Sequence, residues 1–223
     1  MHPAIILREE IVCLIILLFL FFMAKAFKMG KASRSFNRLT WFAIFHVAFD
    51  TITLITVNNQ DVVPPWINTV CHLIFYMTAV LFANELCYYI MRLCSKNISK
   101  SIYWVGYVVL LIYVIAAELI GIRYRTVDGI VISTGPAAYI AFAVASLYLL
   151  CALTAIMLNY RNLEKMVVCT IVPILIVLLL SEVMQVLVPI FLFTGGAITI
   201  ATVAFFFSLE NPAHVFRQKA MID

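Results

Sequence analysis

Polar side chains interrupt the long apolar runs of this sequence at a few places, and these residues have the types and spacing needed for chemistry. Asp50 follows His46 by four residues, and Tyr76 follows His72 by four, so the members of each pair share one face of a helix. Carboxylate, imidazole, phenol and amide groups of this kind recognise small polar ligands through hydrogen bonds and charge. The candidate ligand-binding residues are His46, Asp50, His72, Tyr76, Glu118, Glu182 and Gln185.

The elements that must position these groups are long apolar segments. Apolar residues make up 65% of the chain and charged residues 12%, and the mean hydropathy is +1.08. A helix needs about 20 apolar residues to cross the ~30 Å hydrocarbon core of a bilayer. The sequence therefore predicts an all-α membrane protein, a bundle of seven transmembrane helices, over Ile11–Ala26, Leu39–Val57, Trp66–Met91, Ile102–Ile120, Pro136–Leu158, Met166–Leu187 and Ile190–Leu209.

The distribution of Lys and Arg predicts the orientation of this bundle. Twelve of the fifteen basic residues fall in the first, third and fifth connections and in the tail, and only Arg8, Arg123 and Arg125 fall on the other side. Basic residues gather in cytoplasmic loops. We therefore expect the N-terminus outside and the C-terminus in the cytoplasm of a multi-pass protein of the inner (plasma) membrane. The basic residues have this topological role, and no nucleic-acid partner is expected.

The depth of the polar groups suggests that they share one space. Asp50 lies eleven residues past Leu39, roughly 16 Å from the cytoplasmic edge. The other candidates, except His46, lie at or above that depth, so one cavity open to the outside would account for the set. The alternative is separate pairing, with Asp50 on His46, Glu118 on Arg123, and Glu182 on a neighbouring hydroxyl.

Two further features have local explanations. Asp128-Gly129 lies between two β-branched runs, which predicts a short outer β-hairpin between the fourth and fifth helices, placed to cover the mouth of the bundle. Glu85 falls about 28 Å below Trp66, at the cytoplasmic edge. We expect it to pair there with a Lys or Arg.

Several function classes lack their motifs. The sequence contains no Gly-x-Ser-x-Gly and no His-Glu-x-x-His, and the last predicted span has no Lys for a retinal Schiff base. His46, Asp50 and His72 are suitable metal ligands by type, but the two histidines are expected at different depths. We expect no enzymatic activity within these residues, no metal and no cofactor.

The last residues carry a resemblance. Phe205-Phe206-Phe207-Ser208-Leu209 ends the seventh span and leads to Glu210-Asn211-Pro212, then to a short helical segment that ends in Lys219-Ala220-Met221-Ile222-Asp223. This junction resembles that of membrane-bound bacterial diguanylate cyclases of the GGDEF type. The seven-span layout and the outer Asp-Gly hairpin are similar to the sensor domains of that family. The catalytic domain is absent from this chain.

The resemblance implies a sensor domain over 1–210 and the start of a cytoplasmic linker helix over 211–223. In that reading a small extracytoplasmic ligand changes the bundle, and Asn211, Pro212 and Phe216 transmit the change to an output domain, a diguanylate cyclase, in a homodimer joined through the linker. Two alternatives stay open. The same polar residues could line the path of a small-solute transporter or channel, or they could pair internally in a membrane scaffold.

Overall fold

The computed structural model describes residues 3–26, 33–95, 100–127, 129–188 and 193–210, and for a few of them, including Glu118, only the backbone. Within these ranges the chain forms seven α-helices, one β-hairpin and two short helical turns. The helices are α1 (Pro3–Ala26), α2 (Ser33–Val57), α3 (Pro65–Cys94), α4 (Lys100–Ile120), α5 (Pro136–Asn159), α6 (Lys165–Leu187) and α7 (Phe193–Phe205). A 3₁₀ turn, η1 (Tyr160–Asn162), follows α5, and a π turn, η2 (Phe206–Glu210), follows α7.

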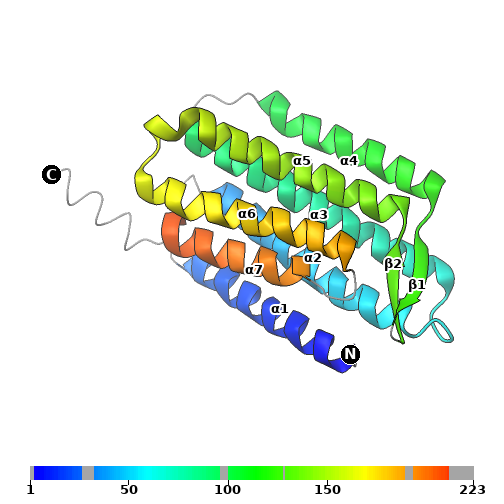
Figure 1. Cartoon of the computed structure of the whole chain (residues 1–223). Coiled ribbons are helices and arrows are strands. Elements are labelled where there is room, and N and C mark those ends of the chain that lie inside the picture. The colour runs from blue at the N-terminus through cyan, green and yellow to red at the C-terminus, as the bar shows by residue number, and fades with distance from the viewer. Residues whose placement is uncertain (1–2, 27–32, 96–99, 128, 189–192, 211–223) are drawn as a thin grey trace.

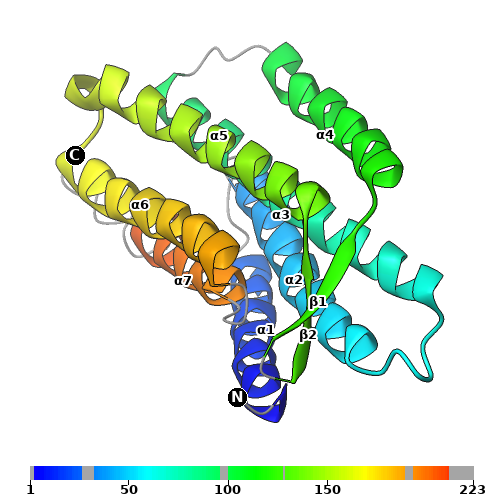
Figure 2. The same ribbon diagram turned by 45° about the vertical axis from the view of Figure 1, so that its right-hand side comes forward.

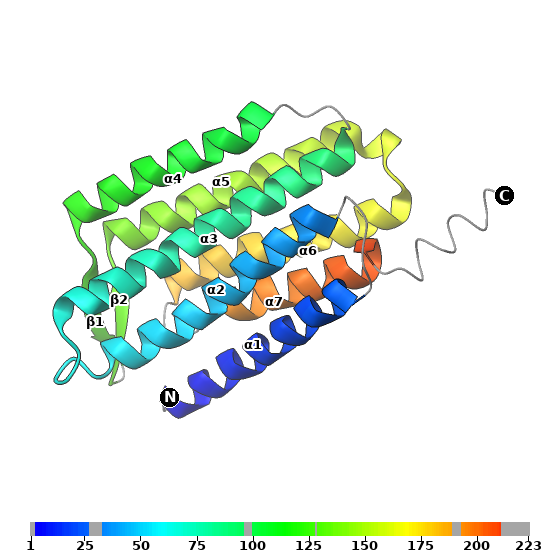
Figure 3. The same ribbon diagram turned by 180° about the vertical axis from the view of Figure 1, so that it is seen from behind.

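The helices run alongside one another as a single bundle (Figure 1). The most extensive contacts of α3 are with α2 and α5, while α1 packs on α2 and α7, and α4 lies at the outer edge against α3 and α5. Viewed from behind, α4 and α1 occupy opposite sides of the bundle (Figure 3). The α3 helix is thus central, and half or more of its side chains are buried.

Four of the described helices, α2, α3, α5 and α6, are long and apolar enough to cross a membrane. Apolar stretches in α4 (Trp104–Ala117) and in α7 with η2 (Phe193–Leu209) are shorter. Large apolar side chains are exposed along the outer helices, as lipid contact requires. On α4 this face includes Trp104, Val108, Leu111, Ile112, Ile115 and Leu119.

The predicted spans agree with the helices at most of their ends but not at every start. The predicted ends at Ala26, Val57, Ile120 and Leu187 are also the last residues of α1, α2, α4 and α6. The first helix, however, begins at Pro3 and not at Ile11, so Glu9 and Glu10 are helical. The apolar run marks where hydrocarbon contact begins, whereas the helix extends into the polar residues before it.

The predicted hairpin is present. Strands β1 (Arg123–Val127) and β2 (Ile130–Thr134) pair antiparallel, with Val127 opposite Ile130 and Gly129 in the turn at a φ of 78°. The inward-facing Ile130 and Ile132 are buried against Leu54 of α2.

The free edge of β2 is covered by one side chain from α2's C-terminal end. The Val131 amide donates to Asn58 Oδ1 at 3.0 Å, and the Asn58 amide group donates back to the Val131 carbonyl at 3.4 Å. Such a reciprocal pair satisfies backbone groups that an edge strand would leave open. The hairpin is therefore fixed to α2 and lies at the same end of the bundle as the start of α1 (Figure 2).

Small residues set the closest helix contacts. Ala137, Ala141 and Ala145, which follow one another at four-residue spacing, are all fully buried on α5. They allow α5 to approach α3 closely, as small residues do between membrane helices. Gly106 has the same role on α4, because a Cβ at this position would lie 2.1 Å from Asn84 Oδ1 of α3.

Replacing Gly106 by Ala should therefore displace the buried Asn84 amide or push α4 away from α3. We expect Gly106→Ala to lower the stability by about 1–3 kcal/mol, the usual cost of overpacking. Thermal unfolding in lipid nanodiscs measures this effect. The double variant Gly106→Ala/Asn84→Ala should recover most of the loss, because it removes the atoms that clash; a double variant no more stable than Gly106→Ala would contradict the assignment.

Candidate functional site

A cavity of about 50 Å³ lies under the hairpin, between α2, α3, α5 and α6. It is large enough for a few water-sized groups, since one water needs about 10–15 Å³ by this measure. Its polar lining combines side chains from each of these helices and from β2: Asp50, Thr53, His72, Tyr76, Ser133, Thr134, Tyr139 and Gln185. Apolar and aromatic residues, among them Leu54, Phe75 and Phe142, complete the wall.

Four of the predicted binding residues thus meet in one space: Asp50, His72, Tyr76 and Gln185. They come from the consecutive helices α2 and α3 and from the distant helix α6. The spacing within each helix places its polar residues on one face, and the packing of α2, α3 and α6 turns these faces toward each other. The shared-cavity interpretation accounts for these residues better than separate pairing does.

Asp50 contributes the one carboxyl group to the described lining of this cavity. Its side chain is 2% exposed, and Oδ2 has no hydrogen-bond partner among the described residues. The backbone carbonyl of Asp50 accepts a hydrogen bond from the Thr53 hydroxyl at 2.8 Å. No Lys or Arg lines the described wall of the cavity. A buried carboxylate oxygen left open in this way is suited to a donor or a cation brought by a ligand.

His72 and Tyr76 connect α3 to the hairpin. The Tyr76 hydroxyl donates to Ser133 Oγ at 2.7 Å, which ties α3 to β2 directly. The His72 ring packs edge-on against Tyr124 of β1 at 5.2 Å between centroids, and its Nδ1 lies 2.9 Å from the Asn68 carbonyl. Burial raises the pKa of the Tyr124 hydroxyl above its usual value, so this ring stays neutral. The predicted hairpin therefore covers the cavity and contributes to its wall.

The two residues on α6 have different surroundings. Gln185 lines the cavity, and its Oε1 accepts a hydrogen bond from the Phe193 amide at 3.1 Å, at the start of α7. Glu182 instead lines a second cavity, about 270 Å³ between α5 and α6, with Ser146 and Leu187. The two cavities share Tyr139, Phe142 and Val186 as walls. Glu182 Oε2 has no hydrogen-bond partner in the part of the chain that is described.

Two predicted residues lie elsewhere. His46 is fully buried below the cavity, where its ring stacks on Phe75 at 4.7 Å and its Nδ1 lies 3.4 Å from the Thr78 hydroxyl. The direct pairing of His46 with Asp50 is absent among the described contacts, because the imidazole is directed toward α3. Glu118 belongs to the last turn of α4, and its side chain lies outside the described part of the structure. Its expected pairing with Arg123 therefore stays a prediction.

The sequence analysis missed one buried acidic residue. Glu10 on α1 is 1% exposed, and its Oε2 has no hydrogen-bond partner within the described ranges. It lies close enough to Asp50 for the two carboxylates to repel each other. Glu10 precedes the first apolar run, so its position in the sequence indicated a loop. The one signal in the sequence was that two glutamates, Glu9 and Glu10, directly precede the apolar run. The structure leaves Glu9 exposed and buries Glu10.

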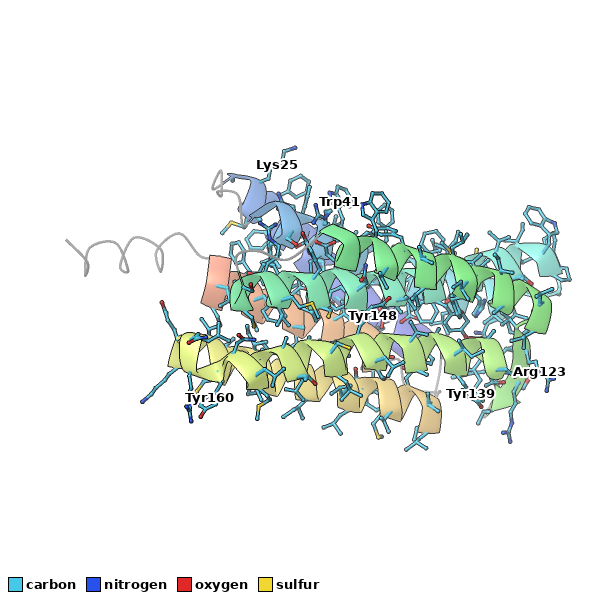
Figure 4. All side chains as sticks on the ribbon, turned by 90° about the horizontal axis from the view of Figure 1, so that it is seen from above. Lys25, Trp41, Arg123, Tyr139, Tyr148 and Tyr160 are labelled. Atoms are coloured by element: carbon cyan, nitrogen blue, oxygen red, sulfur yellow. The ribbon has the colours of Figure 1, made fainter. Side chains whose placement is uncertain are left out.

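The opposite end of the bundle carries an ion pair. Arg38 Nη2 and Nε lie 2.8 and 3.1 Å from Glu85 Oε1, and Ser35 donates to the same oxygen at 2.6 Å. The prediction that Glu85 pairs with a basic residue is confirmed. Figure 4 shows Lys25 and Tyr160 toward this end and Arg123 at the other. Asn211, Pro212 and Phe216, the predicted transmission residues, lie outside the described residues.

Among the described side chains, no group of three His, Cys, Asp or Glu residues is arranged to hold a metal ion. No protein-family model matches the chain, and no curated protein matches it significantly. The inference to function therefore depends on the cavity itself.

Proposed function

We propose that this chain is the membrane-embedded input domain of a receptor, which binds a small polar ligand in the cavity under the hairpin. The observation that carries the proposal is the open oxygen of Asp50, a buried carboxylate on the wall of a cavity without a basic residue in its described lining. Burying such a group costs several kcal/mol unless a partner compensates for it. A bound ligand supplies that partner.

The arrangement of the helices also suits signal transmission. The cavity is bounded by α6, and Gln185 of α6 accepts a hydrogen bond from the first residue of α7. The α7 helix and the η2 turn that follows it end at the side of the bundle opposite the hairpin (Figure 1). A ligand that binds two arrangements of α6 unequally would shift α7. From the resemblance at the end of the sequence, we propose a diguanylate cyclase as the output domain.

The proposal requires seven membrane spans, the hairpin outside and the basic end in the cytoplasm. We expect a Cys at Asp61, in the exposed loop between α2 and α3, to react with a membrane-impermeant thiol reagent in intact cells. A Cys at Arg161, in the exposed turn η1, should react only after the membrane is opened. Both variants need a background in which exposed native cysteines are replaced. Reaction of the Arg161→Cys protein in intact cells would reverse the orientation and contradict an extracytoplasmic site.

A further inference from the structure

Three helices, α1, α2 and α7, contact one another pairwise. Seen from behind, α1 lies on the side of α2 away from α3 and α5 (Figure 3). Glu10 lies sixteen residues before the end of α1, and Asp50 lies seventeen residues after the start of α2. At 1.5 Å per residue both are about 25 Å from the connection that joins these antiparallel helices. The two carboxylates therefore lie at the same depth, which agrees with the electrostatic repulsion between them.

The carboxylate of Glu10 lies directly against the backbone of α7. A Cβ placed on Gly195 would be 2.6 Å from Glu10 Oε2 and 2.7 Å from Oε1. Any side chain other than hydrogen at this position would displace the carboxylate. One turn further along both helices, the Cys13 thiol lies near the Thr199 side chain, so α1 and α7 stay adjacent over this region. The glycine thus provides the space that the acidic side chain fills.

Three buried oxygens, one on each of these helices, lack partners. Glu10 Oε2, Asp50 Oδ2 and Thr194 Oγ1 have no hydrogen-bond partner among the described groups, and the three residues are 1%, 2% and 1% exposed. The two neighbours of Glu10 on α1, Glu9 and Ile11, are both exposed, so the burial is specific to Glu10. Buried charges in proteins are paired or coordinate an ion. Two neighbouring carboxylates repel each other unless a proton or a cation lies between them.

We propose that Glu10, Asp50 and Thr194 form a binding site for one Na⁺ ion at the α1–α2–α7 junction. Carboxylate and hydroxyl oxygens are hard ligands that suit alkali and alkaline-earth cations. Mg²⁺ keeps several waters and Ca²⁺ takes six to eight oxygen ligands, which a closely packed junction of three helices does not provide. This site needs no molecule in the cavity, but it shares Asp50 with the ligand proposal, so an ion bound there would connect the cavity wall to α7. Glu10→Gln and Gly195→Ala change no residue of the described cavity lining and therefore test the ion separately from the ligand.

Thermal unfolding in lipid nanodiscs tests the site, with NaCl compared against N-methyl-D-glucamine chloride at equal ionic strength. We expect Na⁺ to raise the melting temperature of the wild type by about 5 °C once the ion is well above its Kd. Glu10→Gln and Asp50→Asn should abolish the rise. Glu9→Gln, a change to the exposed neighbour, should keep it. A KCl arm separates Na⁺ from alkali cations in general.

Gly195→Ala provides a test that leaves every ligand oxygen in the chain. It should displace the Glu10 carboxylate and reduce Na⁺ binding at least tenfold, whereas Gly196→Ala, with no atom within 4 Å of the added Cβ, should bind Na⁺ as the wild type does. Binding of ²²Na⁺ to the wild-type protein is measured directly, so the test does not depend on whether a variant folds.

Absence of ²²Na⁺ binding to the wild type would overturn the proposal. Equal Na⁺ effects in Glu10→Gln and Glu9→Gln would overturn it as well, as would a stabilisation that depends on pH alone.

Discussion

Asp50→Asn is expected to make the unliganded protein more stable and to remove its response to ligand. In Na⁺-free buffer the Asp50 carboxyl is buried near Glu10 and has no partner at Oδ2, so its ionisation is costly and a neutral amide of the same shape avoids that cost. We expect a gain of about 1–3 kcal/mol, the desolvation cost of an unsatisfied buried group. Melting temperatures in N-methyl-D-glucamine chloride measure it. Functional sites commonly trade stability for activity in this way.

The direction of this change separates a binding role from a structural one. If Asp50 stabilised the bundle through internal pairing, Asp50→Asn would lower the melting temperature. Asp61→Asn, which changes an exposed loop carboxylate, serves as the control and should leave the melting temperature within about 1 °C. A destabilised Asp50→Asn protein would favour the scaffold interpretation of the buried polar groups.

Arg38→Met is expected to be the most destabilising single change outside the cavity. It leaves Glu85, which is 1% exposed, as a buried carboxylate with Ser35 as its one remaining described donor. Removing one partner of a buried ion pair costs about 3–5 kcal/mol; Arg38 is 43% exposed, so we expect the lower end, about 3 kcal/mol. Chemical or thermal unfolding in nanodiscs provides the measurement.

Two comparisons make this second expectation specific. Arg161→Met removes a basic residue at the same end of the bundle, but Arg161 lies in the exposed turn after α5. This substitution should lower the free energy of unfolding by less than about 0.5 kcal/mol. The double variant Arg38→Met/Glu85→Leu replaces the ion pair by apolar groups and should regain most of the lost stability. A double variant as unstable as Arg38→Met would show that the loss comes from packing of the Arg38 stem.

The parts of the fold that follow from short-range chemistry were predictable from the sequence. Solvation by lipid requires runs of apolar residues of a given length, so the apolar segments locate the helices. The Asp128-Gly129 turn signal locates the hairpin, and residue depth along α3 places Glu85 at the basic end. In each case one local rule, about length, turn type or rise per residue, determines the outcome.

The remaining features depend on how the helices are rotated and aligned. Glu10 is buried because α1 is in register with α2 and because Gly195 of α7 leaves space, and neither fact is visible in the first ten residues. His46 and Asp50 lie one turn apart, yet the His46 ring stacks on Phe75 of α3. Glu182 shares its helix with Gln185 but opens into the neighbouring cavity. Sequence spacing gives the face of a helix and leaves open what that face contacts.

The central claim is that the cavity under the hairpin holds a small molecule through Asp50. The most direct measurement exposes wild-type and Asp50→Asn nanodiscs to a mixture of small metabolites and identifies what each retains after washing by mass spectrometry. We expect the wild type to retain a compound at about one per chain, and Asp50→Asn to retain it at least tenfold less, the loss expected for a hydrogen bond to a charged group. Equal retention by the two proteins, or passage of the retained compound across liposomes that contain the wild type, would contradict a receptor site at Asp50.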